Sequence, residues 1–479
     1  MDHHRQDHAA AGPRAWKKPL AVLFLLLAGL GGLLYVASPY AAKPYGLVVT
    51  PSAIAAIDEA FDGGYAWKLL LPYAYNKGDG GYARYAWAPS SLIPLYLLEK
   101  TLPPKAVYMG LALFMAGFVF LLTFKAGGGL SLAALVSIFL TLGTHLHYNF
   151  TMGNTNLFYL VYCYAALHLY ALLPWLRGRQ PSRGDRLLLA LALILLFFSG
   201  DHWLAYICGL LGALMAVAGL SLKHGQEKML RGLYGAGGSA LGALALYVAV
   251  RSLYAGEHLA PGTEEELIFA HQSMLLMVDD FFNNFMTFLY MVLSVFLPPL
   301  PFLDGSQSAL FLSEAQVLAG QNGYHPSHTQ LVWYSHVFMW RYAAGLLAAC
   351  FFWRLWRWFE EARRHFSRDA LVKLSLGLAV CGSFSFYLLI KMRPYNSMPA
   401  LGYKTALGVF FFSLLCAYVI VRRGERTSRR RFRLLYGGCI GLVVISFLTR
   451  PFMLTRWLAV DGLVGMWRSP LTDFLRGLW

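Results

Sequence analysis

Long apolar runs separated by short polar links cover most of the chain. A helix needs roughly 17 to 25 apolar residues to cross a hydrocarbon core of about 30 Å, and about eleven runs meet or approach that length. Lipid offers backbone groups no hydrogen-bond partner, so each run is expected to be helical. The pattern predicts an all-α, polytopic transmembrane helical bundle. The expected spans are 19–38, 106–124, 130–147, 157–176, 187–200, 202–222, 232–254, 331–353, 371–390, 405–421 and 434–449.

The composition agrees with this pattern, since 58% of the 479 residues are hydrophobic and only 13% are charged. Both values lie outside the usual range of soluble globular domains. The first run follows Arg14, Lys17 and Lys18 and has no small-x-small cleavage site before Pro39. We therefore interpret it as a retained signal anchor.

The net charge of +16 is explained by membrane topology. If the N-terminus is cytoplasmic, the arginine-rich links 177–186, 354–368 and 422–433 all face the cytoplasm. An excess of Lys and Arg is typical of cytoplasmic links. We therefore expect a multi-pass protein of the cell membrane with its N-terminus inside and its C-terminus outside, and no nucleic-acid partner.

The chain is expected to form one membrane domain without internal repeats. Its parts outside the membrane are the cytoplasmic tail 1–18, the first external loop 39–105, the large external region 255–330 and the external C-terminal tail 450–479.

The apolar stretch 281–302 is the ambiguous element of this topology. It is interrupted by Pro298, Pro299 and Pro301, and a crossing here would put the basic link 354–368 outside. We expect a re-entrant or interfacial element, and a twelfth span is the alternative.

No metal or cofactor is expected. The six cysteines all lie inside expected spans, and the pairs His145 with His147 and His325 with His328 lack a third ligand at a recognisable spacing. The chain also lacks the motifs of phosphate-binding loops, serine hydrolases and zinc proteases, which argues against an ATP-driven pump or a serine hydrolase.

The first external loop carries carboxylates beside aromatic residues. A helix over 52–66 would place Asp58 and Asp62 four residues apart on one face, where each charge raises the other's pKa. Such a pair suits a general base acting on a sugar hydroxyl, and nearby Tyr65 suits stacking on a sugar ring. The alternative is a solvated loop with ordinary surface acids.

Cations gather where the outer ends of spans meet the headgroups. Lys391, Arg393 and Lys404 lie between the ninth and tenth expected spans, and Arg341 lies within the eighth. Because such cations are costly unless paired and arginine binds phosphate bidentately, these residues are candidates for holding a lipid phosphate. Snorkelling to ordinary headgroups is the alternative.

A third group, Asp201, His202 and Trp203, lies at the external turn between two spans. In one interpretation Asp201 orients His202 at a substrate. In the other, these residues cap the turn and anchor it in the membrane interface.

Several short motifs follow one another in the first half of the chain. They are Asp62-x-x-Tyr65, Tyr85-Ala86-Trp87-Ala88-Pro89, Ser91-Leu92-Ile93-Pro94-Leu95, Leu102-Pro103-Pro104-Lys105-Ala106, Met152-Gly153-Asn154-Thr155-Asn156 and Arg177-Gly178-Arg179. In order and spacing, over roughly the first 220 residues, they resemble GT-C glycosyltransferases, most closely the polyprenyl-phosphate-mannose-dependent group.

The resemblance implies a GT-C-like fold with two large external loops, and transfer of a mannose-like hexose or a pentose. The donor would be a polyprenyl-phosphate sugar and the acceptor a glycolipid or polysaccharide. Asp62, with Asp58 as second choice, would be the base, and Arg393 with Lys391 or Lys404 would contact the donor phosphate. The chain departs from the family at 199–203, where those enzymes often show Lys followed by Pro.

Two other function classes stay open. A transporter or lipid flippase would use buried charges to line a pathway, although neither inverted repeats nor paired broken helices are visible. A non-catalytic membrane scaffold would retain the fold without the chemistry.

Overall fold

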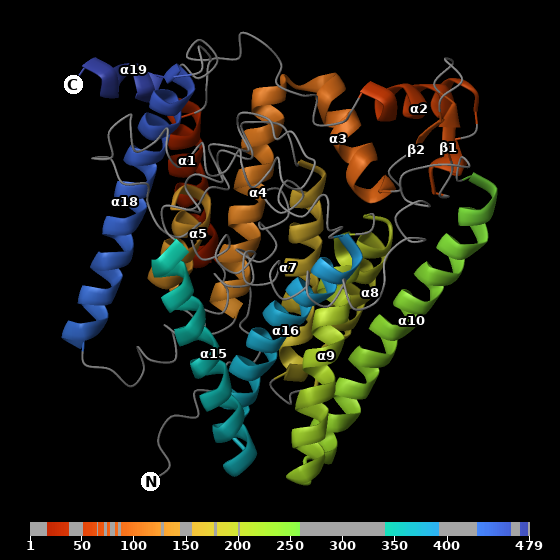
Figure 1. Cartoon of the computed structure of the whole chain (residues 1–479), viewed down its shortest axis with the longest axis vertical. Helices are drawn as coiled ribbons and strands as arrows, with labels where there is room; N and C mark the ends of the chain where they lie inside the picture. Colours follow the sequence, from red (N-terminus) through yellow and green to blue (C-terminus); the bar gives the residue numbers. More distant parts are fainter. Residues whose placement is uncertain are drawn as a thin grey trace.

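The computed structural model (Figure 1) describes residues 17–37, 51–64, 66–70, 74–76, 82–84, 88–125, 129–143, 156–176, 180–199, 202–258, 341–391, 429–460 and 470–477. These ranges are helical apart from one short hairpin. The elements are α1 (Lys17–Ala37), α2 (Pro51–Asp62), η2 (Ala66–Leu70), β1 (Ala74–Asn76), β2 (Tyr82–Arg84), α3 (Pro89–Thr101), α4 (Pro104–Lys125), α5 (Leu130–Leu142), α7 (Asn156–Leu176), α8 (Arg183–Phe197), α9 (His202–Lys223), α10 (Glu227–His258), α15 (Arg341–Arg364), α16 (Arg368–Lys391), α18 (Arg429–Val460) and α19 (Pro470–Gly477).

The helices follow the expected spans. Each expected span except 405–421 overlaps one of them, and that span lies outside the described residues, as does the part of 331–353 before Arg341. Shorter apolar helical stretches lie in α4, α5, α7, α16 and α18. Three stretches in the described part have the length and apolar composition to cross a membrane: Lys17–Ala37, Tyr206–Lys223 and Met229–Val250. A helical membrane protein is thus supported, while the number of crossings stays a prediction.

The outer surface of the bundle is apolar along several helices. Phe24 of α1 is 73% exposed and Leu346 of α15 is 68% exposed, and Leu191 of α8, Leu246 of α10 and Leu434 of α18 are exposed as well. Soluble proteins rarely expose so much contiguous apolar surface. Lipid chains would cover these side chains without cost.

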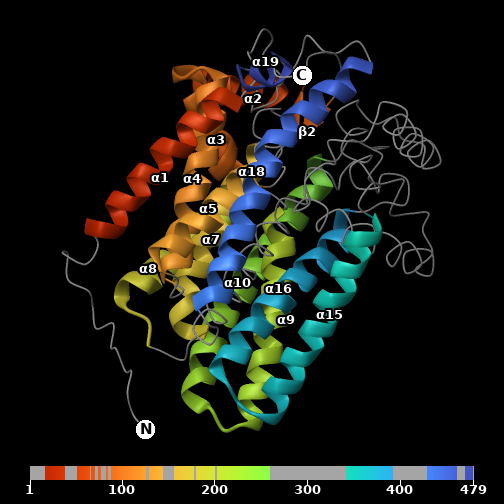
Figure 2. The same cartoon turned by 90° about the vertical axis from the view of Figure 1, so that its left-hand side faces the viewer.

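The described helices end and begin at two ends of the bundle (Figures 1 and 2). At one of them α4, α7, α9 and α15 end, and α5, α8, α10 and α16 begin. We call it the basic end, because Lys125, Arg183, Arg186 and Arg231 lie there. The helices α2 and α3 and the hairpin lie at the opposite end, the first-loop end.

The stretch 281–302 lies outside the described residues, so its re-entrant or interfacial placement stays a prediction. The described helices before and after it are α10 and α15. The last residue of α10 and the first residue of α15 both lie away from the basic end (Figure 1).

The first external loop differs from the expectation in two ways. The helix over 52–66 stops at Asp62, because Gly63 and Gly64 follow and Gly64 has a φ of +70°, a left-handed conformation that ends helices. Further along, β1 and β2 form an antiparallel hairpin in which Ala74 pairs with Arg84. The all-α fold therefore carries a small hairpin that was not predicted.

The first turn of α3 is fastened to the bundle. Ser90 donates its amide N–H to the Phe198 carbonyl at 3.0 Å and its hydroxyl to the Leu195 carbonyl at 2.7 Å. It thereby satisfies carbonyls at the end of α8 that have no helical partner. Tyr164 of α7 donates its hydroxyl to the Ser90 carbonyl at 2.6 Å. These bonds hold α3 against α7 and α8.

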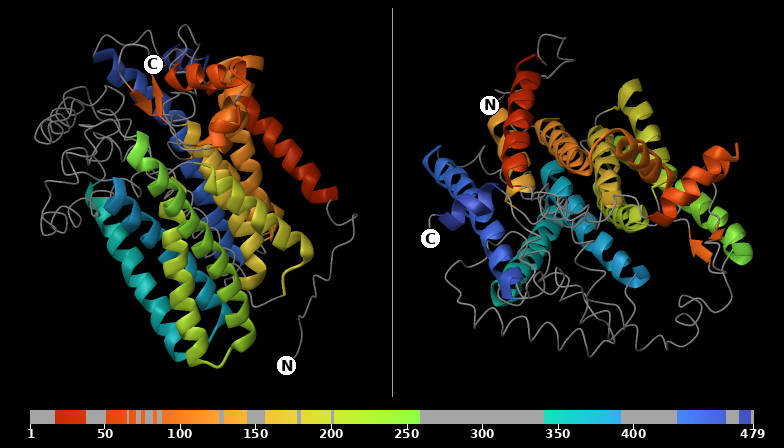
Figure 3. Two further views of the ribbon diagram at one scale, coloured as in Figure 1. Left: turned by 90° about the vertical axis from the view of Figure 1, so that its right-hand side faces the viewer. Right: turned by 90° about the horizontal axis from the view of Figure 1, so that it is seen from above.

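The helices α15 and α16 stand beside α9 and α10 (Figure 3). The helices α9 and α16 come close together at two glycines. A Cβ atom on Gly382 would lie 2.7 Å from the Cα atom of Gly209, which is too close for any larger side chain. Small residues at such crossings are typical of helix packing in membranes.

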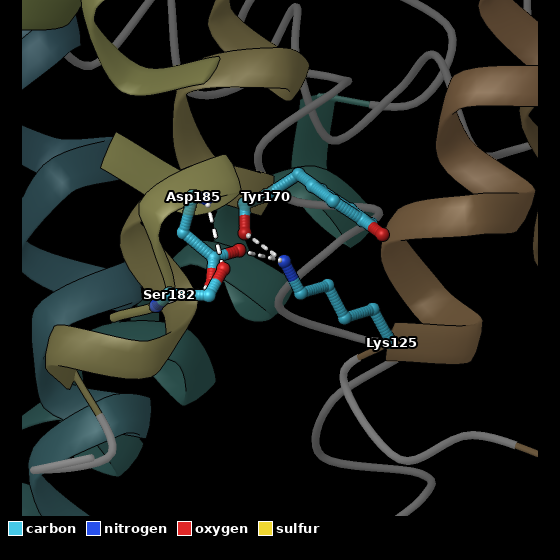
Figure 4. Close-up of polar contacts among 4 residues, drawn as sticks. All are labelled: Lys125, Tyr170, Ser182 and Asp185. Atoms are coloured by element: carbon cyan, nitrogen blue, oxygen red, sulfur yellow. Dashed lines mark hydrogen bonds and ion pairs between the residues drawn. The ribbon is translucent and has the colours of Figure 1, made fainter. Parts of the chain in front are cut away.

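At the basic end, Lys125 joins α4 to α7 and α8 (Figure 4). Its Nζ donates to Asp185 Oδ1 at 2.8 Å and to the Tyr170 carbonyl at 3.1 Å, and lies 3.6 Å from the centre of the Tyr170 ring. Asp185 also forms a capping box with Ser182 at the start of α8. Burial raises the pKa of Asp185, but the hydrogen bonds from Lys125 and Ser182 outweigh it and hold the pKa below its usual value.

Candidate functional site at the first-loop end

The predicted site residues are described to different extents. Asp58 and Asp62 both lie on α2, and their side chains are described. Three further residues lie at helix ends, and the structure describes their backbone but not their side chains. His202 begins α9, Arg341 begins α15 and Lys391 ends α16. The remaining four lie wholly outside the described residues: Tyr65, Asp201, Arg393 and Lys404. The site is therefore built from the two carboxylates.

Asp58 is held by two side chains of α3. Tyr96 donates its hydroxyl to Asp58 Oδ1, and Lys100 donates from Nζ to the same oxygen at 2.7 Å. Tyr96 and Lys100 are four residues apart, so both reach α2 from one face of α3. The Lys100 Nζ also lies 4.5 Å from the centre of the Tyr96 ring. The three side chains form one polar contact between α2 and α3.

This contact changes the acid–base properties of all three groups. The hydrogen bonds from Lys100 and then from Tyr96 hold the pKa of Asp58 below its usual value of 3.8. The bond to Asp58 raises the pKa of Lys100, while burial and then the bond to Asp58 raise the pKa of Tyr96. The expectation of a raised Asp58 pKa is therefore wrong, because a cation contacts this carboxylate directly.

Asp62 has different surroundings. It is the last residue of α2, one turn after Asp58, and its side chain is exposed. The predicted four-residue spacing on one helix is confirmed. A hydroxyl group can approach Asp62, whereas the Asp58 carboxylate already accepts two hydrogen bonds. Of the two carboxylates, Asp62 is therefore the more accessible to a hydroxyl group.

Aromatic rings border the carboxylates. Phe61 stacks on Tyr96, with ring centres 6.3 Å apart and planes inclined by 5°, and is itself 46% exposed. Trp67, on the η2 turn that follows α2, is 61% exposed. An exposed carboxylate with exposed rings nearby offers both a base and an apolar surface to a carbohydrate.

Tyr96 and Lys100 were not predicted as site residues. Their four-residue spacing just before an expected span was the available signal. The bonds to Asp58 join positions 38 and 42 residues apart in the chain. Hydrophobic periodicity contains no information about such a pairing, so only the fold reveals it.

Trp203 is not the interfacial anchor that one interpretation expected. Its side chain is 0% exposed and packs edge-on against Tyr247 of α10, with ring centres 5.2 Å apart. The ring of Phe197 of α8 lies beside it at a tilt of 43°. An anchoring tryptophan faces the headgroup region instead. The ring fills the core between α8 and α10, and the roles of Asp201 and His202 stay predictions.

Among the described residues, no group of three or more His, Cys, Asp or Glu side chains is arranged to hold a metal ion. Comparisons with protein-family models, with curated proteins and with solved structures find no match to this chain. The case for a function therefore depends on the residues themselves.

Proposed function

We propose that the chain is a GT-C-type glycosyltransferase of the cell membrane. It moves a mannose-like hexose or a pentose from a polyprenyl-phosphate donor to a glycolipid or cell-surface glycan on the outer face. The observation that supports this most is the contrast within α2, where the exposed carboxylate of Asp62 follows the ion-paired Asp58 by one turn. The order of the first-loop motifs supports the choice of family.

Asp62 acts as the general base. The acceptor hydroxyl attacks the anomeric carbon of the donor sugar while the bond from that carbon to the phosphate oxygen breaks. The hydroxyl proton passes to the Asp62 carboxylate, and the polyprenyl phosphate leaves with the electron pair. The reaction inverts the anomeric configuration and consumes no nucleotide.

Asp58 is a positioning residue in this mechanism. Its bonds to Tyr96 and Lys100 fix α2 against α3, and α3 is fastened to the bundle through Ser90. Asp62 is thereby held at a constant place relative to the membrane-facing helices. Holding a reacting group in position supplies part of the rate enhancement of most enzymes.

The departing phosphate gains negative charge as the sugar leaves, so cations near it lower the barrier. We assign this role to Arg393 with Lys391 or Lys404, and a supporting contact to Arg341. The sugar subsite is assigned to Tyr65, Asp201 and His202.

The test is transfer of radiolabelled sugar from polyprenyl-phosphate donors in membranes that contain the full-length protein. Asp62→Asn keeps the size of the side chain and removes the base, so we expect the rate to fall by about 10²-fold or more at an unchanged protein level. Glu59→Gln is the matched control, because it removes a neighbouring exposed carboxylate of the same helix, and it should retain the wild-type rate.

A wild-type rate in Asp62→Asn would contradict the assigned base. If the wild-type protein transfers no sugar from any donor tried, a flippase or a scaffold becomes the better description. Movement of labelled lipid across proteoliposome membranes would then identify the flippase, and its absence would leave the scaffold.

A further inference from the structure

The exposed side of α15 changes character along its length. After Tyr342 near its start, which is 80% exposed, the exposed residues are Leu346 and Leu347, then Trp353 and Trp356, which are 55% and 60% exposed, and then Arg357. Aliphatic, aromatic and charged residues follow one another in this order where a helix passes from lipid chains through the headgroup region into water. On this pattern the two tryptophans are expected at the headgroup level of the basic end.

The opposite side of α15 fixes the orientation of this band. Ala348 and Ala362 are buried, and Leu355 lies midway between them against α16. A Cβ atom on Gly377 of α16 would lie 2.6 Å from Leu355 Cδ1, so the two helices are closely packed here. The helix α15 lies at the edge of the bundle (Figure 2). Because it cannot rotate without losing this packing, the exposed tryptophans stay on its outer side.

Two guanidinium groups lie within the tryptophan band. The Cζ atom of Arg354 lies 4.9 Å from the centre of the Trp353 ring, which keeps this cation at the level of the indole. Arg357 is exposed and follows Arg354 by three residues, so the two are neighbours on the helix surface. The band therefore presents two adjacent cations flanked by two indoles.

Within the part of the chain that the structure describes, no ion pair joins Arg354 or Arg357 to a carboxylate. Glu360 accepts from Arg364 at 2.9 Å and from Arg363 at 3.5 Å, so it is engaged by the last turn of the helix. Glu361 is exposed and lies one turn beyond Arg357, further from the tryptophans. The charge of the last turn is balanced locally, and that of Arg354 and Arg357 faces outward.

We propose that Trp353, Arg354, Trp356 and Arg357 form a binding site for the headgroup of an anionic phospholipid. A phosphodiester accepts paired hydrogen bonds from guanidinium groups. The indole N–H groups suit the ester region, and the indole rings pack on the upper parts of the acyl chains. The site selects by charge, because a zwitterionic headgroup adds an ammonium group that the arginines repel.

The test is lipid retention by the full-length protein in nanodiscs made from equal amounts of phosphatidylglycerol and phosphatidylcholine, measured by native mass spectrometry. The wild-type protein released from the nanodiscs should carry more bound phosphatidylglycerol than phosphatidylcholine. In the double variant Arg354→Gln/Arg357→Gln, the ratio of bound phosphatidylglycerol to bound phosphatidylcholine should be at least 5-fold lower. The matched control Arg363→Gln/Arg364→Gln removes the same charge from the same helix and should keep the preference.

Equal losses in the two double variants would overturn the proposal, because they would show an effect of net charge alone. An unchanged preference in Arg354→Gln/Arg357→Gln would overturn it as well. If that variant does not yield folded protein, the single variants Arg354→Gln and Arg357→Gln, at exposed positions, should each show part of this loss while their elution profiles match wild type. A retained preference there would contradict the proposed site.

Discussion

Two lysine–carboxylate pairs, one at each end of the bundle, have nearly the same geometry in different surroundings. The bond from Lys100 to Asp58 measures 2.7 Å and that from Lys125 to Asp185 measures 2.8 Å. The side chains of the first pair are 55% and 39% exposed, and those of the second are 23% and 18% exposed. Burial, rather than distance, separates the two pairs.

The difference has a physical cause. Water competes for exposed ion pairs and screens them, so they contribute little to stability. Removing one partner of a mostly shielded pair lowers the free energy of unfolding by more, because the remaining charge stays uncompensated. The exposed pair at the first-loop end is thus expected to contribute less to stability than the shielded pair at the basic end, where Lys125 joins three helices.

The largest stability effect should follow from breaking the shielded pair. Lys125→Met removes the cation that Asp185 and the Tyr170 carbonyl share, and is expected to cost about 1.5–3 kcal/mol. The measurement is the thermal midpoint of the purified protein in detergent. Lys100→Met is the comparison variant and should lower the midpoint clearly less. Equal losses would contradict the distinction between the two pairs.

A smaller effect is expected when only the cap of α8 is removed. In Ser182→Ala the Asp185 amide N–H loses its acceptor, the Ser182 hydroxyl oxygen, while the Lys125 pair remains. The expected loss is about 1 kcal/mol. Because both variants act on one cluster, Lys125→Met combined with Ser182→Ala should cost less than the sum of the two single losses.

The smallest effect concerns pH and the exposed pair. Since the folded pKa of Asp58 lies below 3.8, the contact is fully present above that value and is lost as the pH falls through the lowered pKa. The distance between spin labels at Ala55 of α2 and Leu97 of α3 should therefore stay constant from about pH 7 to about pH 4 and widen below. Widening that already starts near pH 6 would contradict the direction of the shift.

The bundle was predictable because its helices are specified locally. The apolar run 157–176 became α7 (Asn156–Leu176), and 202–222 became α9 (His202–Lys223), each within a residue of its predicted limits. The end of α2 was missed because the positive φ of Gly64 overrides the amphipathic pattern of the residues before it. Element type follows from periodicity, while exact ends depend on single residues.

The site was predictable only in part. The spacing of Asp58 and Asp62 follows from one helix and was correct. The engagement of Asp58 by Tyr96 and Lys100 depends on how α3 docks, which Ser90 determines through its bonds to α8. Contacts between distant segments of this kind are set by tertiary packing, and no local pattern in the chain encodes them.

The most direct test of the account compares the two carboxylates of α2 in one experiment, the transfer of labelled sugar by Asp62→Asn and by Asp58→Asn at matched protein levels. The account predicts that Asp62→Asn abolishes transfer, because the base is gone, whereas Asp58→Asn retains measurable transfer at a lower rate, because only positioning is weakened. Retained transfer in Asp62→Asn together with complete loss in Asp58→Asn would contradict the account and assign the base to the ion-paired carboxylate.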